Sequence, residues 1–342
     1  MLRNGLTLMR VWLPSALLLA TADARARLVP PSGCILHGGG QEPGCFESYS
    51  QFLGARGPAV KMFYLGMDRD LNTTPPGDPP AWFTAALASL EDDAGPDSAW
   101  IIPQIGLELP LHGNEARVAA GDYDNAISAL CVGLRLLERP VFLRIGYEFN
   151  GMEWNGYRPA SYRGAYRRIA LAIRADPMLN PQTALVWDGT CDSKTDPTPY
   201  YPGADVVDWQ GINIFSGSSA PFAPEHSCLW YWLSGNTVSG TPLMIGESTP
   251  RSFFTNDSAT WGAWFAPLID VLDRYPIVQL VSYIDQDWVT AEGGRWPGWG
   301  DARVELPAAG VVGSNWRAEL AKARWVNRSN KTGIRALLGL VP

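Results

Sequence analysis

The sequence predicts an α/β protein built as one (β/α)8 TIM barrel, in which eight parallel strands close on themselves inside a ring of helices. Eight short apolar runs alternate with helical patterns, and no linker or internal repeat divides the chain. Its 342 residues suit one barrel with its loops. An open doubly wound sheet is the alternative, but no GxGxxG or P-loop motif follows any run, and eight strands fit closure better.

The strands are expected in apolar segments of strand length. In order, these segments are Cys34–His37, Val60–Leu65, Trp100–Ile105, Val141–Ile145, Ala184–Trp187, Val206–Ile214, Pro242–Gly246 and Ile277–Ile284. Three- and four-residue apolar spacing predicts helices at Ala81–Asp93, Tyr123–Glu138, Ala160–Ala175, Ser258–Arg274 and Asn315–Val326. Pro159 marks a helix start, and the helices near Pro199 and Leu229–Leu233 are expected to be short.

Residues 1–26 are expected to be a signal peptide, ahead of one barrel domain at residues 27–342. Arg3 and Arg10 give a positive start, and Val11–Ala20 is apolar but too short to span a bilayer. Ala24-Arg25-Ala26 is a candidate cleavage site, and a buried N-terminal helix is the alternative. We therefore expect a secreted, extracellular protein.

Net charge and tryptophan content indicate which kinds of partner the protein can bind. A formal net charge of −7 argues against nucleic acid and anionic membranes, which both attract basic surfaces, and leaves neutral substrates open. The 15 tryptophans supply large flat rings, either for the core or for stacking on sugar rings. We expect a monomer that has no contact with a membrane after export.

The cysteine pattern favours disulfides over a metal site. There is no CxxC pair, and three histidines cannot complete a convincing ligand set, so we expect neither metal nor cofactor. In an oxidising compartment Cys34–Cys45 and Cys191–Cys228 are both plausible bridges, and Cys131 is expected to be a free core thiol.

Two glutamates follow apolar runs where a barrel carries its chemistry, at the C-terminal ends of the strands. Glu148 follows the fourth run and Glu247 the seventh. Alternation places Arg144 on the face of Glu148, and Leu243 and Ile245 on the face of Glu247, so we expect both carboxylates to point inward. One protonated and one ionised carboxyl group can cleave a glycosidic bond, with Arg144 keeping the nucleophile ionised. Either glutamate alone is equally compatible with a strand-end or capping role.

The segment Arg144-Ile145-Gly146-Tyr147-Glu148-Phe149-Asn150-Gly151, followed by Trp154-Asn155-Gly156-Tyr157, resembles strand 4 and its loop in the retaining (β/α)8 glycosidase clan. The most similar family is glycoside hydrolase family 26, mostly β-mannanases. The segments 200–213 and 242–247 resemble its sixth and seventh strands. The resemblance implies that Glu148 is the acid/base and Glu247 the nucleophile. The family carries His, and the wider clan Asn, where this chain has Tyr147, a position that helps to grip the sugar.

Further residues are expected to bind substrate. Trp288 follows the eighth strand, where the clan often has an aromatic platform, and Trp154, Trp296 and Trp299 lie in loops suited to sugar stacking. Strand-end polar residues are expected to bond hydroxyl groups, or alternatively to serve as turn or structural residues. These are His37, Asn150 and Asn213, with Asp188 comparable; Asp301 is expected either to bond hydroxyls or to pair with Arg303, and Glu108 and Glu153 are weaker alternative carboxylates.

Together these features predict a retaining endo-β-glycosidase that hydrolyses a β-linked polysaccharide of the mannan or glucan type. The alternatives are a non-catalytic barrel that binds glycans and a related-family glycosidase with another β-glycan substrate. A metal-dependent barrel hydrolase is disfavoured, since no His-carboxylate cluster ends any strand.

Overall fold

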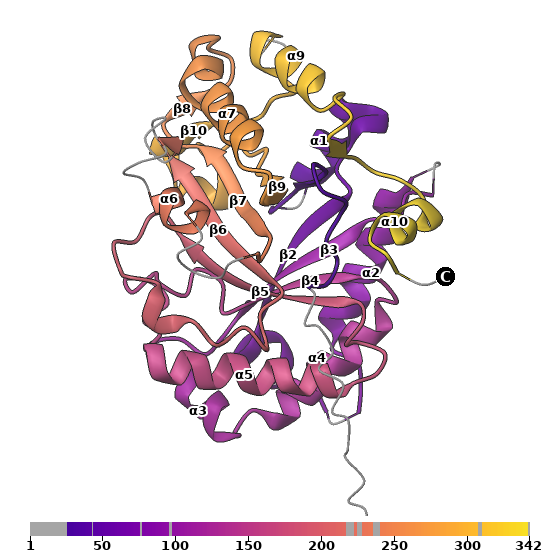
Figure 1. The fold of residues 1–342 in the computed structure, drawn as a ribbon, viewed down its shortest axis with the longest axis vertical. Helices are drawn as coiled ribbons and strands as arrows, with labels where there is room; N and C mark the ends of the chain where they lie inside the picture. Colours follow the sequence, from indigo (N-terminus) through magenta and orange to yellow (C-terminus); the bar gives the residue numbers. More distant parts are fainter. Residues whose placement is uncertain are drawn as a thin grey trace, which may run out of the picture.

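In a computed structural model, the eight predicted runs form a closed parallel barrel (Figure 1). The structure describes residues 26–42, 44–75, 77–95, 98–216, 222–223, 228–234, 240–306 and 310–340. The barrel strands are β1 (Ile35–Gly39), β2 (Val60–Gly66), β3 (Ile102–Glu108), β4 (Val141–Ile145), β5 (Thr183–Thr190), β6 (Trp209–Ser216), β7 (Leu243–Pro250) and β9 (Val278–Tyr283). Pairing of β1 with β9 closes the barrel, which confirms the predicted fold class.

Helices surround the barrel, and those at residues 81–94, 124–136, 159–175 and 266–274 lie where apolar spacing predicts them. They are α1 (Cys45–Leu53), α2 (Ala81–Ala94), α3 (Glu115–Ala120), α4 (Asp124–Leu136), α5 (Pro159–Ala175), α6 (Cys228–Leu233), α7 (Ala266–Arg274), α8 (Ala291–Gly294), α9 (Gly310–Glu319) and α10 (Lys331–Leu337), with short turns η1 (Gly54–Arg56), η2 (Met67–Leu71), η3 (Thr198–Tyr200), η5 (Trp261–Phe265) and η6 (Pro297–Trp299). Pro159 begins α5, as predicted. The helix predicted at Asn315–Val326 is wrong in its bounds, because β11 (Trp325–Val326) pairs with β1 as an extra strand.

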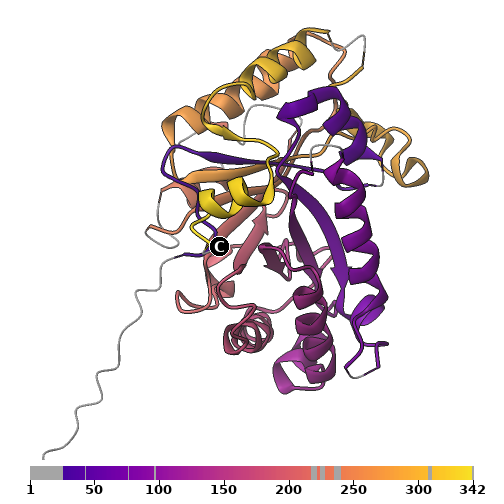
Figure 2. The same ribbon diagram turned by 90° about the vertical axis from the view of Figure 1, so that its right-hand side faces the viewer.

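The lower half of the barrel interior is apolar. Each barrel strand contributes to one buried cluster, through Leu36, Val60, Ile102, Phe142, Ala184, Trp209, Met244 and Leu280. Ile334 and Leu338, in and just after α10, join this cluster, so this segment covers the N-terminal ends of the strands. Figure 2 shows the helix in yellow beside the C mark. The buried polar side chains of the interior, such as Arg144 and Asp188, lie beyond this layer, toward the C-terminal ends of the strands.

One of the two plausible disulfides is present. Cys191, just after β5, is bonded to Cys228 at the start of α6. Cys34 and Cys45 are free thiols, so that predicted pairing is wrong; the Cys45 thiol instead donates to the side-chain oxygen of Gln286. Cys131 is a buried free thiol, as predicted.

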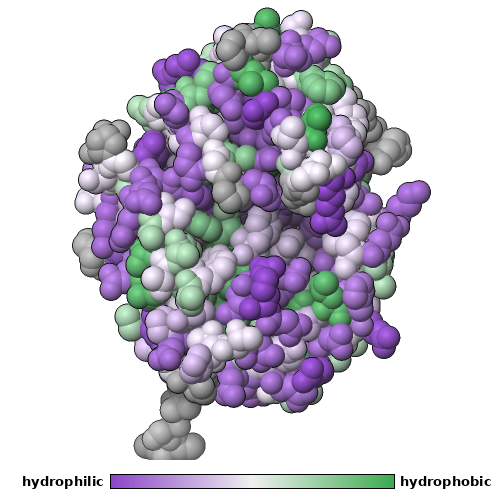
Figure 3. Space-filling view, turned by 180° about the vertical axis from the view of Figure 1, so that it is seen from behind, coloured by the Kyte–Doolittle hydropathy of each residue, from purple (hydrophilic) through white to green (hydrophobic). Residues whose placement is uncertain are grey.

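The outer surface is largely polar. On the face in Figure 3, polar side chains predominate and apolar residues form small separate patches. In the part of the chain that the structure describes, no helix is both long and apolar enough to cross a membrane. The predicted signal peptide lies, apart from Ala26, outside the described residues.

Candidate active site

A buried arginine on β4 organises the upper half of the barrel interior. The Arg144 Nη1 atom lies 2.7 Å from Glu247 Oε1 and 2.9 Å from Asp188 Oδ2, and all three side chains are at most 5% exposed. Burial alone would lower the pKa of Arg144, but the carboxylates of Glu247 and Asp188 outweigh it and raise that pKa. Burial raises the pKa of Asp188 to about 7, although Arg144 opposes the rise. The guanidinium therefore stabilises negative charge on the carboxyl groups beside it, including that of Glu247 in β7.

Two glycines make room for this guanidinium. A Cβ atom on Gly246 would lie 3.2 Å from Arg144 Nη1, and one on Gly106 would lie 3.0 Å from Arg144 Nη2. Tyr64 and Tyr147 flank the same cation, with ring centroids 5.6 and 5.3 Å from Arg144 Cζ. Any side chain at either glycine would push the arginine away from its carboxylates.

Glu247 points inward because of an irregularity in β7. Met244 belongs to the inner apolar cluster, whereas Leu243 and Ile245 pack in the outer cluster between strands and helices. The register between β6 and β7 then shifts, so that Ile212 pairs with Ile245 but Asn213 pairs with Glu247. The extra residue, Gly246, turns Glu247 inward. The inward orientation agrees with the sequence prediction, but the alternation offered for it is wrong.

Glu148 stands on a tight turn beyond the end of β4. That strand ends at Ile145, and Gly146 and Glu148 take left-handed φ values of 59° and 53°. The Asn155 amide donates to the carbonyl oxygens of Tyr147 (3.1 Å) and Glu148 (2.8 Å) and so holds the turn. Strain at a non-glycine residue persists only where the surroundings over-determine it, which is typical of functional sites.

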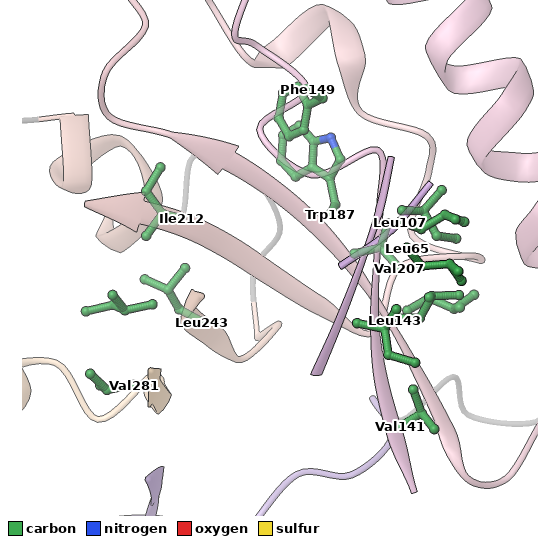
Figure 4. Packing of buried hydrophobic residues seen from close by; sticks show 14 of the residues in the cluster. Leu65, Leu107, Val141, Leu143, Phe149, Trp187, Val207, Ile212, Leu243 and Val281 are labelled. Atoms are coloured by element: carbon green, nitrogen blue, oxygen red, sulfur yellow. The ribbon is translucent and has the colours of Figure 1, made fainter. Parts of the chain in front are cut away.

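Phe149 anchors the other side of this turn. Its ring stacks on the ring of Trp187, with centroids 4.8 Å apart and planes 9° apart, and both side chains are fully buried (Figure 4). Since Phe149 directly follows Glu148, this contact fixes the backbone from which the carboxylate projects. The predicted acid therefore stands on rigid, packed structure.

Two donors hold the Glu148 carboxylate. Asn213 Nδ2 donates to Oε1 at 3.1 Å, and Trp154 Nε1 donates to Oε2 at 2.9 Å. The Asn213 side-chain oxygen also faces Arg144 Nη1 at 3.4 Å, so Asn213 links the two catalytic candidates. Burial and the nearby charge of Glu247 raise the pKa of Glu148 to about 8. Thus Glu148 can carry a proton at neutral pH while Glu247 lies against a cation.

Two predicted substrate residues lie elsewhere. His37 is fully buried beneath the helices, and its ring nitrogens contact Tyr49 Oη (2.9 Å) and Asn327 Oδ1 (3.0 Å). Asn150 joins the ends of β4 and β5 by bonding both the N–H and the carbonyl of Thr190. Their polar atoms bond to protein groups, which favours the structural alternative for both residues.

The tryptophans after β9 gather at the C-terminal end of the barrel. Trp299 lies between Trp288 and Trp296, with centroids 5.0 and 5.1 Å away, and is half-buried like Trp296. Trp288 is 2% exposed and donates to Thr249 Oγ1, so it supports Trp299 and presents no open face to a sugar. Asp301 pairs with Arg303 at 2.7 Å, the alternative left open by the sequence.

Sequence reasoning missed several residues that shape the site. Asn155 lies in the loop motif that resembles the glycosidase clan but receives no role from it, and Tyr64 belongs to no motif. Gln104 crosses the interior, donating to the Gly246 carbonyl at 2.8 Å and accepting from Ser282 Oγ at 2.8 Å. The spacing of Gln104, Gly106 and Glu108, all polar or small on one face of an apolar strand, is the signal that identifies an interior polar layer.

Known proteins of similar sequence are named as xylan-degrading enzymes. The chain is 28% identical over 251 residues to a β-1,3-xylanase from Alcaligenes sp, covering 65% of this chain and 51% of that protein. It is 27% identical over 337 residues to a β-1,3-xylanase from Vibrio sp, covering 89% and 68%. The chain thus spans about half the length of the first of these relatives. No protein-family model matches the chain.

Solved structures of similar fold are also glycosidases. A family 26 β-mannanase from Bacteroides ovatus matches with a TM-score of 0.61 and 15% identity, covering 88% of this chain and 92% of that one. A family 30 endoxylanase from Clostridium papyrosolvens matches with a TM-score of 0.51 and 12% identity, covering 83% and 72%.

The chain therefore has the (β/α)8 barrel fold of these solved glycosidases, in line with the resemblance seen in the sequence. Its two relatives by sequence carry xylanase names, whereas the solved structure with a TM-score of 0.61 is a mannanase.

Proposed function

We propose that the protein is a retaining endo-β-glycosidase, with Glu148 as acid/base and Glu247 as nucleophile. The observation that carries this proposal is the contrast between the two carboxyl groups. Glu247 lies 2.7 Å from a buried guanidinium, whereas the pKa of Glu148 is raised to about 8. Glycosidic bond cleavage needs one ionised and one protonated carboxyl group on either side of the sugar.

In the first step, Glu148 protonates the leaving-group oxygen while Glu247 attacks the anomeric carbon. In the second step, Glu148 takes a proton from water, which then releases the sugar from Glu247 with retained configuration. Asn213 and Trp154 keep the Glu148 carboxyl group aimed, and Arg144 does the same for Glu247. The Tyr147 ring lies 5.3 Å from Arg144 Cζ, beside the group that holds Glu247, and we expect it to contact the sugar at the cleavage point.

We propose a β-linked polysaccharide as substrate and action outside the cell, as a monomer. The relatives named β-1,3-xylanases favour a xylan backbone over the mannan or glucan expected from the resemblance. Half-buried Trp296 and Trp299 and exposed Trp154 offer ring faces for sugar stacking. The disulfide supports export, because such bonds persist in oxidising compartments.

A screen of purified protein against β-1,3-xylan, β-1,4-xylan, mannan and β-glucan tests the proposal. We expect new reducing ends from at least one of them, and proton NMR of the fresh products should show the β-anomer first. The α-anomer appearing first would contradict retention. Binding to a polysaccharide without hydrolysis would instead favour the glycan-binding barrel.

The pH profile of kcat/KM should fall on its alkaline side with an apparent pKa near 8. Glu148 must carry a proton to act as an acid, and its pKa is raised to about 8 by burial and by Glu247. Above that pH the rate should drop about tenfold for each pH unit. In Glu148→Ala, assayed on an aryl glycoside with a good leaving group, this alkaline limb should disappear. If it persists there, another group titrates.

A further inference from the structure

A carboxylate at the end of β3 is not used by the mechanism above. Glu108 is half-buried, and within the described residues no hydrogen bond or ion pair holds its side chain. Gln104 and Gly106 face the barrel interior, since Gln104 bonds to β7 and β9 and Gly106 faces Arg144. Side chains alternate along a strand, so Glu108 also points to the interior face, at the barrel mouth.

The surroundings of Glu108 connect it to the catalytic pair. A Cβ atom on Gly106 would lie 3.1 Å from both Tyr64 and Tyr147, so these rings stand directly below Glu108. Glu247 and Glu108, after burial, raise the pKa of Tyr147 above its usual range. Glu108 therefore faces the same cleft as the reacting groups, on the side of β2 and β3.

Neighbouring groups fix the backbone on which Glu108 stands. Gly66 pairs with Glu108 across the sheet, and the Arg69 guanidinium lies 3.3 Å from the Cβ position of Gly66. Burial raises the pKa of Glu108, while Arg69 opposes the rise. The Tyr157 hydroxyl group bonds both the N–H (3.0 Å) and the carbonyl (3.1 Å) of Leu109, which fixes the backbone after Glu108.

We propose that Glu108 is a substrate-binding and specificity residue that accepts hydrogen bonds from two adjacent hydroxyl groups of a neutral sugar unit beside the cleavage point. A carboxyl group with two oxygens that no described protein group binds suits a vicinal diol. Asp68 and Asp70 lie on the same side, and although Arg69 pairs with Asp70 at 2.9 Å, acidic side chains outnumber this one cation, which disfavours acidic sugars such as uronates. This inference rests on the proposed glycosidase function and adds a contact and a preference to it.

Binding in a catalytically inactive background separates this inference from catalysis. Calorimetry on Glu247→Ala would use β-1,3-xylopentaose and β-1,4-mannopentaose as probes. Adding Glu108→Gln should weaken binding of the preferred probe about 10- to 100-fold, the range expected for hydrogen bonds to a charged group. Glu91→Gln, an exposed change on α2, is the matched control and should leave binding unchanged.

A second readout follows specificity in the active enzyme. Glu108→Gln should change which bond of a reducing-end-labelled xylopentaose is cut. It should also lower the ratio of activity on neutral xylan to activity on glucuronoxylan. A merely structural residue would lower the melting temperature without moving the cut. Unchanged binding and an unchanged cut would overturn the inference while hydrolysis by the wild type still supports the proposed function. Failure of Glu247→Ala to bind either probe, with no hydrolysis by the wild type, would overturn both.

Discussion

Glu247→Ala is expected to lose nearly all hydrolysis of every substrate, a decrease of roughly 10⁴-fold or more in kcat. Glu247 is the carboxylate that Arg144 holds at 2.7 Å, and without it no group remains to form the covalent intermediate. Steady-state kinetics on a polysaccharide and on an aryl glycoside would measure the loss on both.

Glu148→Ala should behave differently, because it removes the proton donor and leaves the nucleophile. Natural substrates with poor leaving groups should slow about 10²- to 10⁴-fold. An activated aryl glycoside leaves without protonation, so its first step should suffer far less, whereas hydrolysis of the intermediate should slow through loss of the base.

Added azide distinguishes the two roles. In Glu148→Ala, azide should attack the glycosyl-enzyme and yield a glycosyl azide of retained configuration with faster turnover. In Glu247→Ala, azide can only attack the substrate directly, which gives the inverted azide. The reverse pattern would mean that the roles are exchanged. Glu153→Ala, which removes an exposed carboxylate five residues beyond Glu148, is the matched control and should keep near-normal activity.

The barrel itself could be predicted because each strand is an apolar run of strand length, and each of the eight is present. The short helices α1 and α3 were not predicted, since nine and six residues give little periodic signal. The helix predicted at Asn315–Val326 extends too far because the apolar residues Trp325 and Val326 belong to a strand, which pairs with β1.

The two glutamates of the candidate active site could be located from their positions after apolar runs, but their geometry could not be predicted. A bulge at Gly246 and a left-handed turn at Glu148 decide where both carboxylates point, and both are departures from regular strand geometry. Periodicity assumes a regular strand and therefore reached the inward orientation of Glu247 by a wrong route.

Polar residues at strand ends show a second limit of sequence reasoning. His37, Asn150 and Asn213 all follow apolar runs and look alike in the sequence. Only the structure shows that the first two satisfy buried protein groups, whereas Asn213 bonds the catalytic candidate Glu148. The partner of a polar group, and not its position in a pattern, decides its role.

Arg144→Met is expected to destabilise the fold by about 3–5 kcal/mol, the cost of breaking a buried ion pair by removing one partner. Methionine fills a similar volume but leaves Glu247 and Asp188 buried without their cation. Urea unfolding would measure the change, and activity should fall at least about 100-fold, because Glu247 would lose the cation that pairs with it and holds it in place.

A second substitution tests the reason for that loss. If the uncompensated carboxylates cause the instability, Arg144→Met combined with Asp188→Asn should be more stable than Arg144→Met alone, since one buried charge is gone. Activity should not return, because Glu247 still lacks its partner.

Arg144→Lys keeps the positive charge. However, a lysine ammonium group cannot contact Asp188, Asn213 and Glu247 at once, as the planar guanidinium does. The stability and the activity of Arg144→Lys should therefore lie between those of the wild type and of Arg144→Met. If the Arg144→Met protein is within about 1 kcal/mol of the wild type and has normal activity, the cation neither supports the fold nor positions Glu247. The assignment of Glu247 as a nucleophile held by Arg144 would then be wrong.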